Sequence, residues 1–346
     1  MSALVAVVLF FGVTAYAVFG GADFGAGFWD LVAGGAQRGQ RPRALVDHSI
    51  GPVWEANHVW LIFCLVVLWT AFSPAFASIT LTLFVPLTLA ALGIVLRGSG
   101  FAFRKSVFAT RERRGYGAVF ASSSVLVPYC MGAVAGAIAS GRVPAGGVAG
   151  DWWSSWMNPT SILGGVLAVT VCAYLAAVYL VHDAGRLDQR DMVRYFAARA
   201  TCAAVVAGVV AFAGVFVLYA DASYLFHGLT SRALPLVIVS ALCGLGSLWM
   251  LARGAYRFAR PLAIGAVAAV VVGWGVAQWP YVLPETLKVA QAAAPTATLA
   301  SVLVVFAAAA VLILPSLGLL YVLDQRSVLQ EPPADAHERG GDARAV

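Results

Sequence analysis

The chain has 346 residues, of which 61% are hydrophobic and 11% are charged, and its formal net charge is +6. Soluble domains average about 25% charged residues, so this composition excludes a soluble globular protein and indicates a polytopic membrane protein. The positive charge is concentrated between apolar runs, which is a membrane-topology signal and gives no indication of nucleic-acid binding.

Apolar runs of roughly 20 residues predict transmembrane helices. Nine such runs occur, at about residues 3–34, 54–73, 79–96, 116–139, 160–181, 200–220, 233–251, 261–279 and 297–322. The first run is too long for one straight span, because at 1.5 Å per residue it would extend about 48 Å across a hydrocarbon core of about 30 Å. We therefore expect the first helix to tilt, or to break near Gly20–Gly21 and continue along the inner membrane surface.

The distribution of lysine and arginine tests this count. Nineteen of the 22 lie after odd-numbered helices or in the C-terminal tail, and the three after even-numbered helices are Arg142, Arg232 and Lys288. Positively charged loops stay in the cytoplasm, so the pattern predicts an N-terminus outside and a C-terminus inside. A missed or an extra helix would destroy this alternation, which supports nine spans.

The nine spans form one all-α transmembrane domain, residues 1–323, and fit two four-helix bundles with one extra helix. The segment 280–296 begins and ends with proline, which predicts an ordered outer hairpin or a short surface helix. Residues 324–346 are polar and contain Pro332-Pro333 and Gly340-Gly341, so we expect a disordered cytoplasmic tail.

Asp23 lies within the first apolar run, in the sequence GGADFGAGFWDL. An acid at membrane depth is costly unless it is protonated, paired or hydrated, so such a residue marks a functional site by default. Gly21 and Gly25 form a GxxxG step, which allows a neighbouring helix to approach closely. Asp30, near the end of the same run, is expected at the membrane interface without a functional role.

A second acid, Glu55, lies at the start of the next span, in PVWEANHVWL. Glu55 and His58 are three residues apart and share one helix face. With the intervening loop inside, Asp23 and Glu55 both lie towards the inner membrane surface, where a pair of carboxyl groups suits a proton route from the cytoplasm. The alternative is structural: Asp23 caps a helix break or pairs with an arginine such as Arg97 or Arg104.

Two further pairs of residues accompany these acids. Trp54 and Trp60 flank the same turn and are typical of interfacial anchors, and a contact with a partner or with an oxygen route is the alternative. Arg97 and Arg104 end the third span in RGSGFAFR. Topology alone explains both arginines, and charge compensation for the two acids is the alternative.

Histidine and cysteine patterns indicate no metal site in this chain. His58 is the only histidine within a predicted span, and no second histidine faces it, so a hydrogen-bonding role beside Glu55 is favoured over ligation of haem iron. The five cysteines are single and lie in apolar runs, which is typical of buried thiols. No nucleotide-binding or hydrolytic motif is present.

Four segments resemble subunit II of the cytochrome bd quinol oxidases: GADFGAGFWDL, GPVWEANHVWLI, LRGSGFAFRKS and WPYVLPETL. The resemblance covers nearly the whole chain. It implies a multi-pass subunit of a bacterial plasma membrane, paired with subunit I in a pseudo-symmetric heterodimer, with small single-helix subunits and membrane lipid as further partners. It also implies that subunit I holds two haems b and one haem d, and that this chain holds no haem and no catalytic residue. Quinol is then the substrate of the complex, oxygen is reduced to water, and a structural quinone is a further cofactor to test.

The resemblance implies proton uptake through Asp23 and Glu55, with His58 beside them, and it places Trp60 near an oxygen entrance. Two positions depart from the family pattern. Ala102 stands where the family commonly has an acid in RGxxFEFR, and Gly115 stands where some members carry another acid. The proton route is therefore shorter here or uses another residue.

Two other hypotheses stay open at this point. A secondary transporter could use Asp23 and Glu55 as a proton-coupling pair, although transporters often show broken helices in both halves and only the first helix here has an obvious break. A purely structural subunit would leave both acids inert. Charge-neutral substitution of the acids separates a structural role from a proton route.

Overall fold

The structure is a computed structural model that describes residues 1–35, 37–50, 54–106 and 110–325. The side chains of Trp54 and Glu55 lie outside the described part, and so does the predicted polar tail from residue 326 onwards. The chain divides into two units, Met1–Leu303 and Val304–Val346, and each is described by itself.

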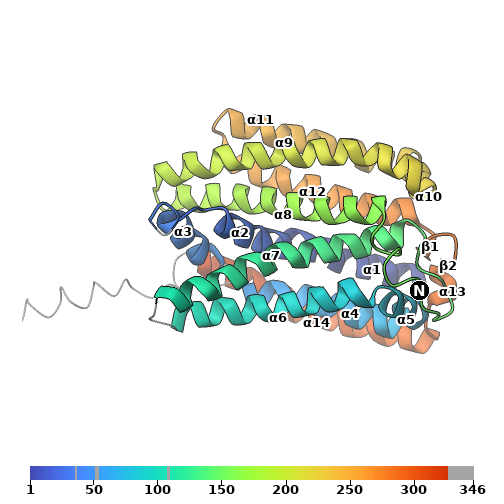
Figure 1. Cartoon of the computed structure of the whole chain (residues 1–346). Helices are drawn as coiled ribbons and strands as arrows, with labels where there is room; N and C mark the ends of the chain where they lie inside the picture. The colour runs from blue at the N-terminus through green and yellow to red at the C-terminus, as the bar shows by residue number, and fades with distance from the viewer. Residues whose placement is uncertain (36, 51–53, 107–109, 326–346) are drawn as a thin grey trace, which may run out of the picture. The chain divides into compact units, whose positions relative to one another are not determined.

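Long helices dominate the first unit (Figure 1). In chain order the elements are α1 (Ser2–Ala15), the π-helical segment η1 (Tyr16–Gly20), α2 (Gly21–Leu31), α3 (Gln40–Ile50), α4 (Trp54–Ala71), α5 (Ser73–Thr82), α6 (Phe84–Ser106), α7 (Thr110–Ala139), α8 (Pro159–Arg186), α9 (Arg190–Asp221), α10 (Ser223–Thr230), α11 (Leu234–Ala252), α12 (Tyr256–Gln278), β1 (Tyr281–Leu283), β2 (Leu287–Lys288), α13 (Val289–Ala292) and α14 (Thr296–Gln325). The second unit begins within α14, at Val304.

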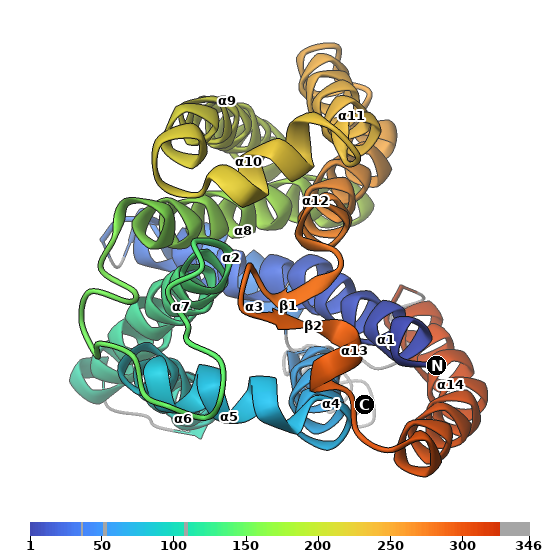
Figure 2. The same cartoon turned by 90° about the vertical axis from the view of Figure 1, so that its right-hand side faces the viewer.

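Helices that follow one another along the chain pack as pairs: α6 with α7, α8 with α9, and α11 with α12. Helix α2 contacts both α7 and α8, and Figure 2 looks along these helices from one end. The largest buried cluster is centred on the second half of α8, where Leu175, Val178 and Leu180 are almost fully buried. The acid-bearing helix α2 therefore lies against the most buried part of the first unit.

The first helix does not break at Gly20–Gly21, so of the two expected alternatives the break is excluded and a tilt stays a prediction. Gly20 and Gly21 both keep right-handed helical angles, with φ of −64° and −60°. Residues Ser2–Leu31 instead form one helix of 30 residues, and its hydrogen bonding widens to a π pattern over Tyr16–Gly20. A π segment accommodates an extra residue without interrupting the helix.

Eight helices of the described residues are long and apolar enough to cross a membrane. A ninth candidate is the pair Ala56–Ala71 and Ser73–Thr82, which is bent by 116° at its junction. At that junction Phe72 leaves the helical region, with φ −135° and ψ 48°, and Pro74 follows in the first turn of α5. The count of nine therefore depends on whether this bent pair crosses as one span.

The bent pair also changes the boundaries of two predicted spans. The span expected at 54–73 ends as helix α4 at Ala71. The span expected at 79–96 begins inside the separate helix α5, and the long apolar helix that follows, α6, starts at Phe84 and extends to Ser106.

The loops sort to two ends of the first unit (Figure 1). Helix α3 and the turn between α8 and α9 lie at one end, and α10, the β1–β2 hairpin and α13 lie at the other. The hairpin pairs Tyr281 with Lys288 and is followed directly by the short helix α13. The prediction that segment 280–296 is ordered, as a hairpin or a short helix, is therefore confirmed. Most predicted cytoplasmic cations belong to the end that carries α3.

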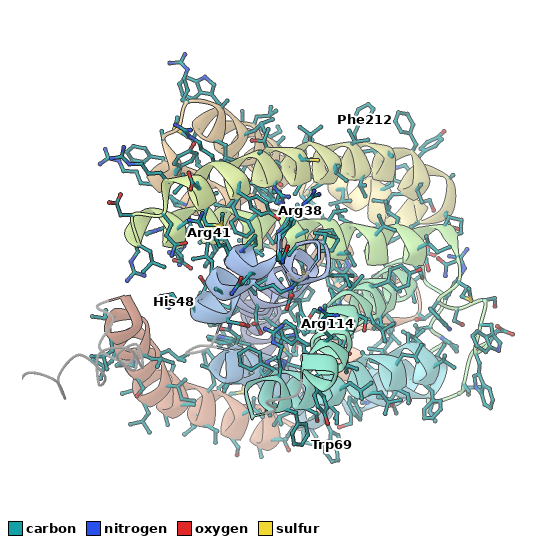
Figure 3. The ribbon with its side chains drawn as sticks, turned by 60° about the vertical axis from the view of Figure 1, so that its left-hand side comes forward. Arg38, Arg41, His48, Trp69, Arg114 and Phe212 are labelled. Carbon is teal, nitrogen blue, oxygen red and sulfur yellow. The ribbon has the colours of Figure 1, made fainter. Side chains whose placement is uncertain are left out.

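Figure 3 views the first unit with the α3 end turned forward, and Arg38, Arg41 and Arg114 are labelled there. Phe212 on α9 and Trp69 on α4 point away from the unit, and these residues are 68% and 64% exposed. Large apolar side chains on an outer helix face suit a lipid or protein environment rather than water.

Candidate functional site

A buried ion pair joins helices α2 and α6. The Nη2 atom of Arg97 donates to Oδ1 of Asp23 at 2.8 Å and to the Asp23 carbonyl at 3.2 Å. The two side chains are 1% and 2% exposed. The Nε atom of Arg97 donates to Ser124 Oγ on α7 at 3.0 Å. Asp23 is thus paired with a positively charged arginine from α6, and Ser124 on a third helix, α7, holds that arginine in place.

Two aromatic rings enclose the arginine. The guanidinium carbon of Arg97 lies 4.9 Å from the ring centroid of Phe24 and 5.0 Å from that of Phe120. Cation–π contacts of this kind strengthen when water is excluded. The ion pair, the Ser124 hydroxyl and the two rings together satisfy a charged group that would otherwise be very costly at this depth.

Glycines make this close packing of helices achievable. A Cβ atom on Gly25 would lie 1.8 Å from the carbonyl oxygen of Cys172 on α8, and one on Gly27 would lie 2.1 Å from Ser124 Oγ on α7. Gly21 also faces α8, with Leu175 at 3.4 Å from its ideal Cβ position. The predicted GxxxG step, Gly21 and Gly25, is therefore where α8 approaches α2.

One oxygen of the buried acid has no protein hydrogen bond within the described residues. Asp23 Oδ2 is buried and unpartnered, whereas Oδ1 is bound to Arg97. A carboxyl group in this state can hold a proton on Oδ2 while Oδ1 keeps its bond to the guanidinium. The geometry thus allows the acid to change protonation state without losing its main structural contact.

A second charged cluster lies two helical turns further along, and the sequence analysis missed it. Arg104 donates from Nη1 to Oδ2 of Asp30 and from Nη2 to Oδ1 of Asp47. Arg43 donates from Nε to Oδ1 of Asp30 at 2.8 Å. Asp30 is only 4% exposed, so this acid is buried within the chain, and its expected position at the membrane interface stays a prediction. Two arginines hold this acid and tie α3 to α2 and α6.

Equal spacings reveal how the two clusters are related. Asp23 and Asp30 are seven residues apart on α2, and Arg97 and Arg104 are seven residues apart on α6. Seven residues make about two turns, or about 10.5 Å of helix, so each pair of residues returns to one face. Asp23 bonds Arg97 and Asp30 bonds Arg104, so α2 and α6 are joined by two ion pairs that are seven residues apart on each helix. This matched spacing is the sequence pattern from which the second ion pair could have been predicted.

The other candidate residues are placed only in part. His58 packs its ring near Tyr16 and Phe24, with centroids 6.4 Å and 5.8 Å away. Trp60 is 9% exposed and meets Phe11 edge-on at 5.6 Å, so this residue is buried in the described chain. The side chains of Glu55 and Trp54 lie outside the described residues, and the distance between Asp23 and Glu55 is therefore not described.

The candidate compensating arginines separate into two roles. Arg97 lies on Asp23, whereas Arg104 lies on Asp30 and Asp47 and not on Asp23. Among the described residues, no group of three or more histidine, cysteine, aspartate or glutamate side chains has a geometry that could hold a metal ion.

A third polar cluster lies at the opposite end of the first unit. Asp221, at the end of α9, accepts two hydrogen bonds from Arg142 at 2.5 and 3.0 Å. The same carboxylate accepts from the Thr160 hydroxyl at 2.6 Å and from the Thr160 amide at 3.2 Å. This cluster connects the end of α9 to the start of α8, and both carboxylate oxygens of Asp221 accept hydrogen bonds.

Comparison with known proteins supplies the family. The model of the cytochrome bd terminal oxidase subunit II family matches residues 1–324. Cytochrome bd ubiquinol oxidase subunit 2 of Bacillus subtilis is 25% identical over 225 residues, which is 64% of this chain and 64% of the relative. Cytochrome bd-I ubiquinol oxidase subunit 2 of Escherichia coli K12 is 29% identical over 218 residues, which is 60% of this chain and 55% of the relative.

These matches span less than two thirds of the length of either curated relative. A solved bd oxidase structure from Geobacillus thermodenitrificans matches more completely, with a TM-score of 0.72 at 25% identity over 93% of this chain and 98% of the matched chain. The resemblance found in the four sequence segments is confirmed. The chain is a multi-pass membrane protein that belongs to the cytochrome bd terminal oxidase subunit II family.

Proposed function

We propose that this chain is the haem-free subunit of a quinol:oxygen oxidoreductase in a bacterial plasma membrane. Its partner, subunit I, would hold two haems b and one haem d, oxidise quinol and reduce oxygen to water. Family membership supports this assignment, since the matched relatives carry the names of cytochrome bd oxidase subunits. The proposed topology has nine spans, with the α4–α5 pair as one of them, the N-terminus outside and the C-terminus in the cytoplasm.

In this proposal Asp23 and Glu55 carry protons from the cytoplasm, with His58 beside them. The observation that supports the route is the half-bound carboxylate of Asp23, which keeps Oδ1 on Arg97 and leaves Oδ2 without a protein partner among the described residues. A purely structural ion pair would be expected to use both oxygens, as Asp221 does. Proton carriers at membrane depth are typically carboxyl groups of this kind.

A structural role for Asp23 is the competing interpretation, and one observation favours it. The ion pair with Arg97 is short and almost fully buried, so it contributes to folding whether or not the acid titrates. The two interpretations differ in what happens when the charge is removed but the shape is kept.

The assembly is tested first. Purification of the tagged chain from its native membrane in mild detergent should bring down a second large subunit, and the absorption spectrum of the complex should show haem b and haem d bands. A colourless preparation of folded chain without a partner would contradict the proposed oxidase and would bring the transporter hypothesis forward.

The proton route is tested in the purified complex by Asp23→Asn and Glu55→Gln. We expect quinol-driven oxygen consumption to fall about tenfold or more, a loss equivalent to at least about 1.4 kcal/mol in the barrier, with the haem bands unchanged. The matched control is Asp191→Asn, because that carboxylate is 72% exposed in a surface pair with Arg41. Unchanged turnover in both acid variants would refute the route and leave the structural role.

A further inference from the structure

A tyrosine hydroxyl lies buried beside the proposed proton carrier. The hydroxyl of Tyr16 is buried and makes no protein hydrogen bond within the described residues, which is also true of Asp23 Oδ2. Buried polar atoms nearly always have a hydrogen-bond partner, either protein or ordered water. Two such atoms in one neighbourhood therefore require an explanation, which the family pattern of acids does not provide.

Three rings show that the two groups share a neighbourhood. The Tyr16 ring meets Phe24, the residue after Asp23, at 6.3 Å, and it meets His58 at 6.4 Å. Phe24 in turn lies under the guanidinium of Arg97, the partner of Asp23. Through Phe24, the Tyr16 ring and the Asp23–Arg97 pair therefore belong to one packed neighbourhood.

The position of Tyr16 depends on the unusual part of the first helix. Tyr16 is the first residue of the π-helical segment, and π segments occur often at functional sites. The ring itself is half-buried whereas the hydroxyl at its end is buried, so the polar tip points inwards. This arrangement directs the hydroxyl into the protein and away from the outer face of the helix.

We propose that the Tyr16 hydroxyl and Asp23 Oδ2 hold one water molecule between them, and that this water stabilises Asp23 in both of its protonation states. The inference rests on the proposed proton route. A hydroxyl both donates and accepts, and a water forms two to four hydrogen bonds, so one molecule satisfies both orphaned atoms. Tyr16 is thus a positioning residue for this water, on the side of Asp23 that faces the N-terminal half of the helix.

The bridge needs no proton transfer to or from tyrosine. When Asp23 is a carboxylate, the water donates one hydrogen bond to Oδ2 and shares a second hydrogen bond with the Tyr16 hydroxyl. When Oδ2 carries a proton, Oδ2 donates that proton's hydrogen bond to the water, and the water donates to the tyrosine oxygen. Every proton stays on its own oxygen, so the water satisfies Asp23 in both protonation states. Removal of the hydroxyl alone takes away the second partner of this water.

The test is Tyr16→Phe in the purified haem-containing complex, compared with Asp23→Asn. We expect Tyr16→Phe to lower quinol-driven oxygen consumption about tenfold with unchanged haem bands. We also expect it to shift the carbonyl stretch of protonated Asp23 in infrared difference spectra, because that group loses its bridged partner. The matched control is Tyr174→Phe, since that buried hydroxyl is bound to Ser247 Oγ at 2.5 Å, away from Asp23.

The outcomes separate this inference from the proposed function. Full turnover and an unshifted Asp23 band in Tyr16→Phe, with slow turnover in Asp23→Asn, would overturn the water bridge and leave the route intact. Full turnover in Asp23→Asn would overturn the route itself. A map of the unmodified complex that resolves waters provides a test independent of variant folding: density within hydrogen-bond distance of both atoms supports the bridge, and its absence overturns it.

Discussion

The buried Asp23–Arg97 pair predicts a large loss of stability when only one of its partners is replaced. Removing one partner of a buried pair leaves an uncompensated charge, which typically costs about 3–5 kcal/mol. Arg97→Gln should therefore lower the yield and the thermal midpoint of the folded protein in detergent, measured by tryptophan fluorescence. The double variant Asp23→Asn with Arg97→Gln should regain most of that stability, because both charges are then absent. Equal losses in the single and double variants would show that packing, not charge, dominates.

A surface pair provides the matched control for this prediction. Arg41 and Asp191 are 62% and 72% exposed and their closest atoms are 3.3 Å apart. Exposed pairs contribute about 0–1 kcal/mol, so Arg41→Gln should leave the thermal midpoint almost unchanged. The contrast between two arginine-to-glutamine changes isolates the effect of burial.

At the scale of residues, the sequence was informative where a residue type is rare. An aspartate in an apolar run stands out, so Asp23 was found, and Arg97 was one of two arginines considered as its partner. The choice between Arg97 and Arg104 depends on how α2 and α6 lie side by side, and one chain does not reveal this directly. The two arginine partners of Asp30 were missed for the same reason, because they come from α3 and α6.

The contact between α2 and α8 provides a prediction at the scale of elements. An added methyl group at Gly25 would meet the backbone carbonyl of Cys172, which a side-chain rotation cannot relieve. Gly25→Ala should therefore separate the helices and reduce the recovery of folded chain with haem-containing partner, quantified by size-exclusion chromatography. Gly208→Ala is the control, because nothing lies within 4 Å of its Cβ position, and it should be neutral or stabilising by up to about 1 kcal/mol.

The charged cluster around Asp30 makes a second prediction about an element. Helix α3 buries Leu45 and Val46, and the Asp47–Arg104 and Arg43–Asp30 ion pairs hold its polar side against α6 and α2. Arg104→Gln removes the ion pair with Asp47. Amide exchange in α3 should therefore accelerate about tenfold, which corresponds to a loss of about 1.4 kcal/mol in the free energy of local opening. Exchange in α9 should not change. Equal acceleration throughout the chain would indicate global destabilisation instead of local release.

Element boundaries were predicted best where apolar runs are bounded by charge. Each span predicted after residue 110 corresponds to one long helix, although α9 begins ten residues before the span expected at 200–220. The region from 54 to 106 was misdivided, since Phe72 and Pro74 create a sharp bend inside a stretch of continuous hydrophobicity. Hydropathy measures the affinity of a segment for lipid and contains no term for such a bend.

At the scale of the whole molecule, the charge distribution predicts which ends face which side of the membrane. Single cysteines introduced as Ser154→Cys and Gly185→Cys lie at opposite ends of α8, in or next to connecting segments. In intact cells an impermeant maleimide should label position 154, and position 185 should react only after the membrane is opened. The unmodified chain supplies the background from its five native cysteines. The reverse labelling pattern would invert the proposed topology.

Family and membrane character could be predicted from the sequence because several separate motifs and an overall apolar composition agreed. The number of spans could be predicted only up to the bent pair, since eight helices of the described part of the chain are long and apolar enough alone and the ninth depends on α4 and α5 together. The route through the chain could not be completed, because the distance from Asp23 to Glu55 depends on side chains outside the described residues.

The π segment of the first helix affects how related sequences should be aligned. A π turn contains roughly one residue more than an α turn, so positions before Tyr16 are rotated by about 100° relative to an uninterrupted helix. Deleting one residue there would close the π turn into an ordinary α turn. Val5 and Ala6 would stay on their buried cluster and Asp23 would stay on Arg97, because the π segment had already absorbed the extra residue. A one-residue gap at this place therefore signals a relative that lacks the π segment but keeps both helix faces.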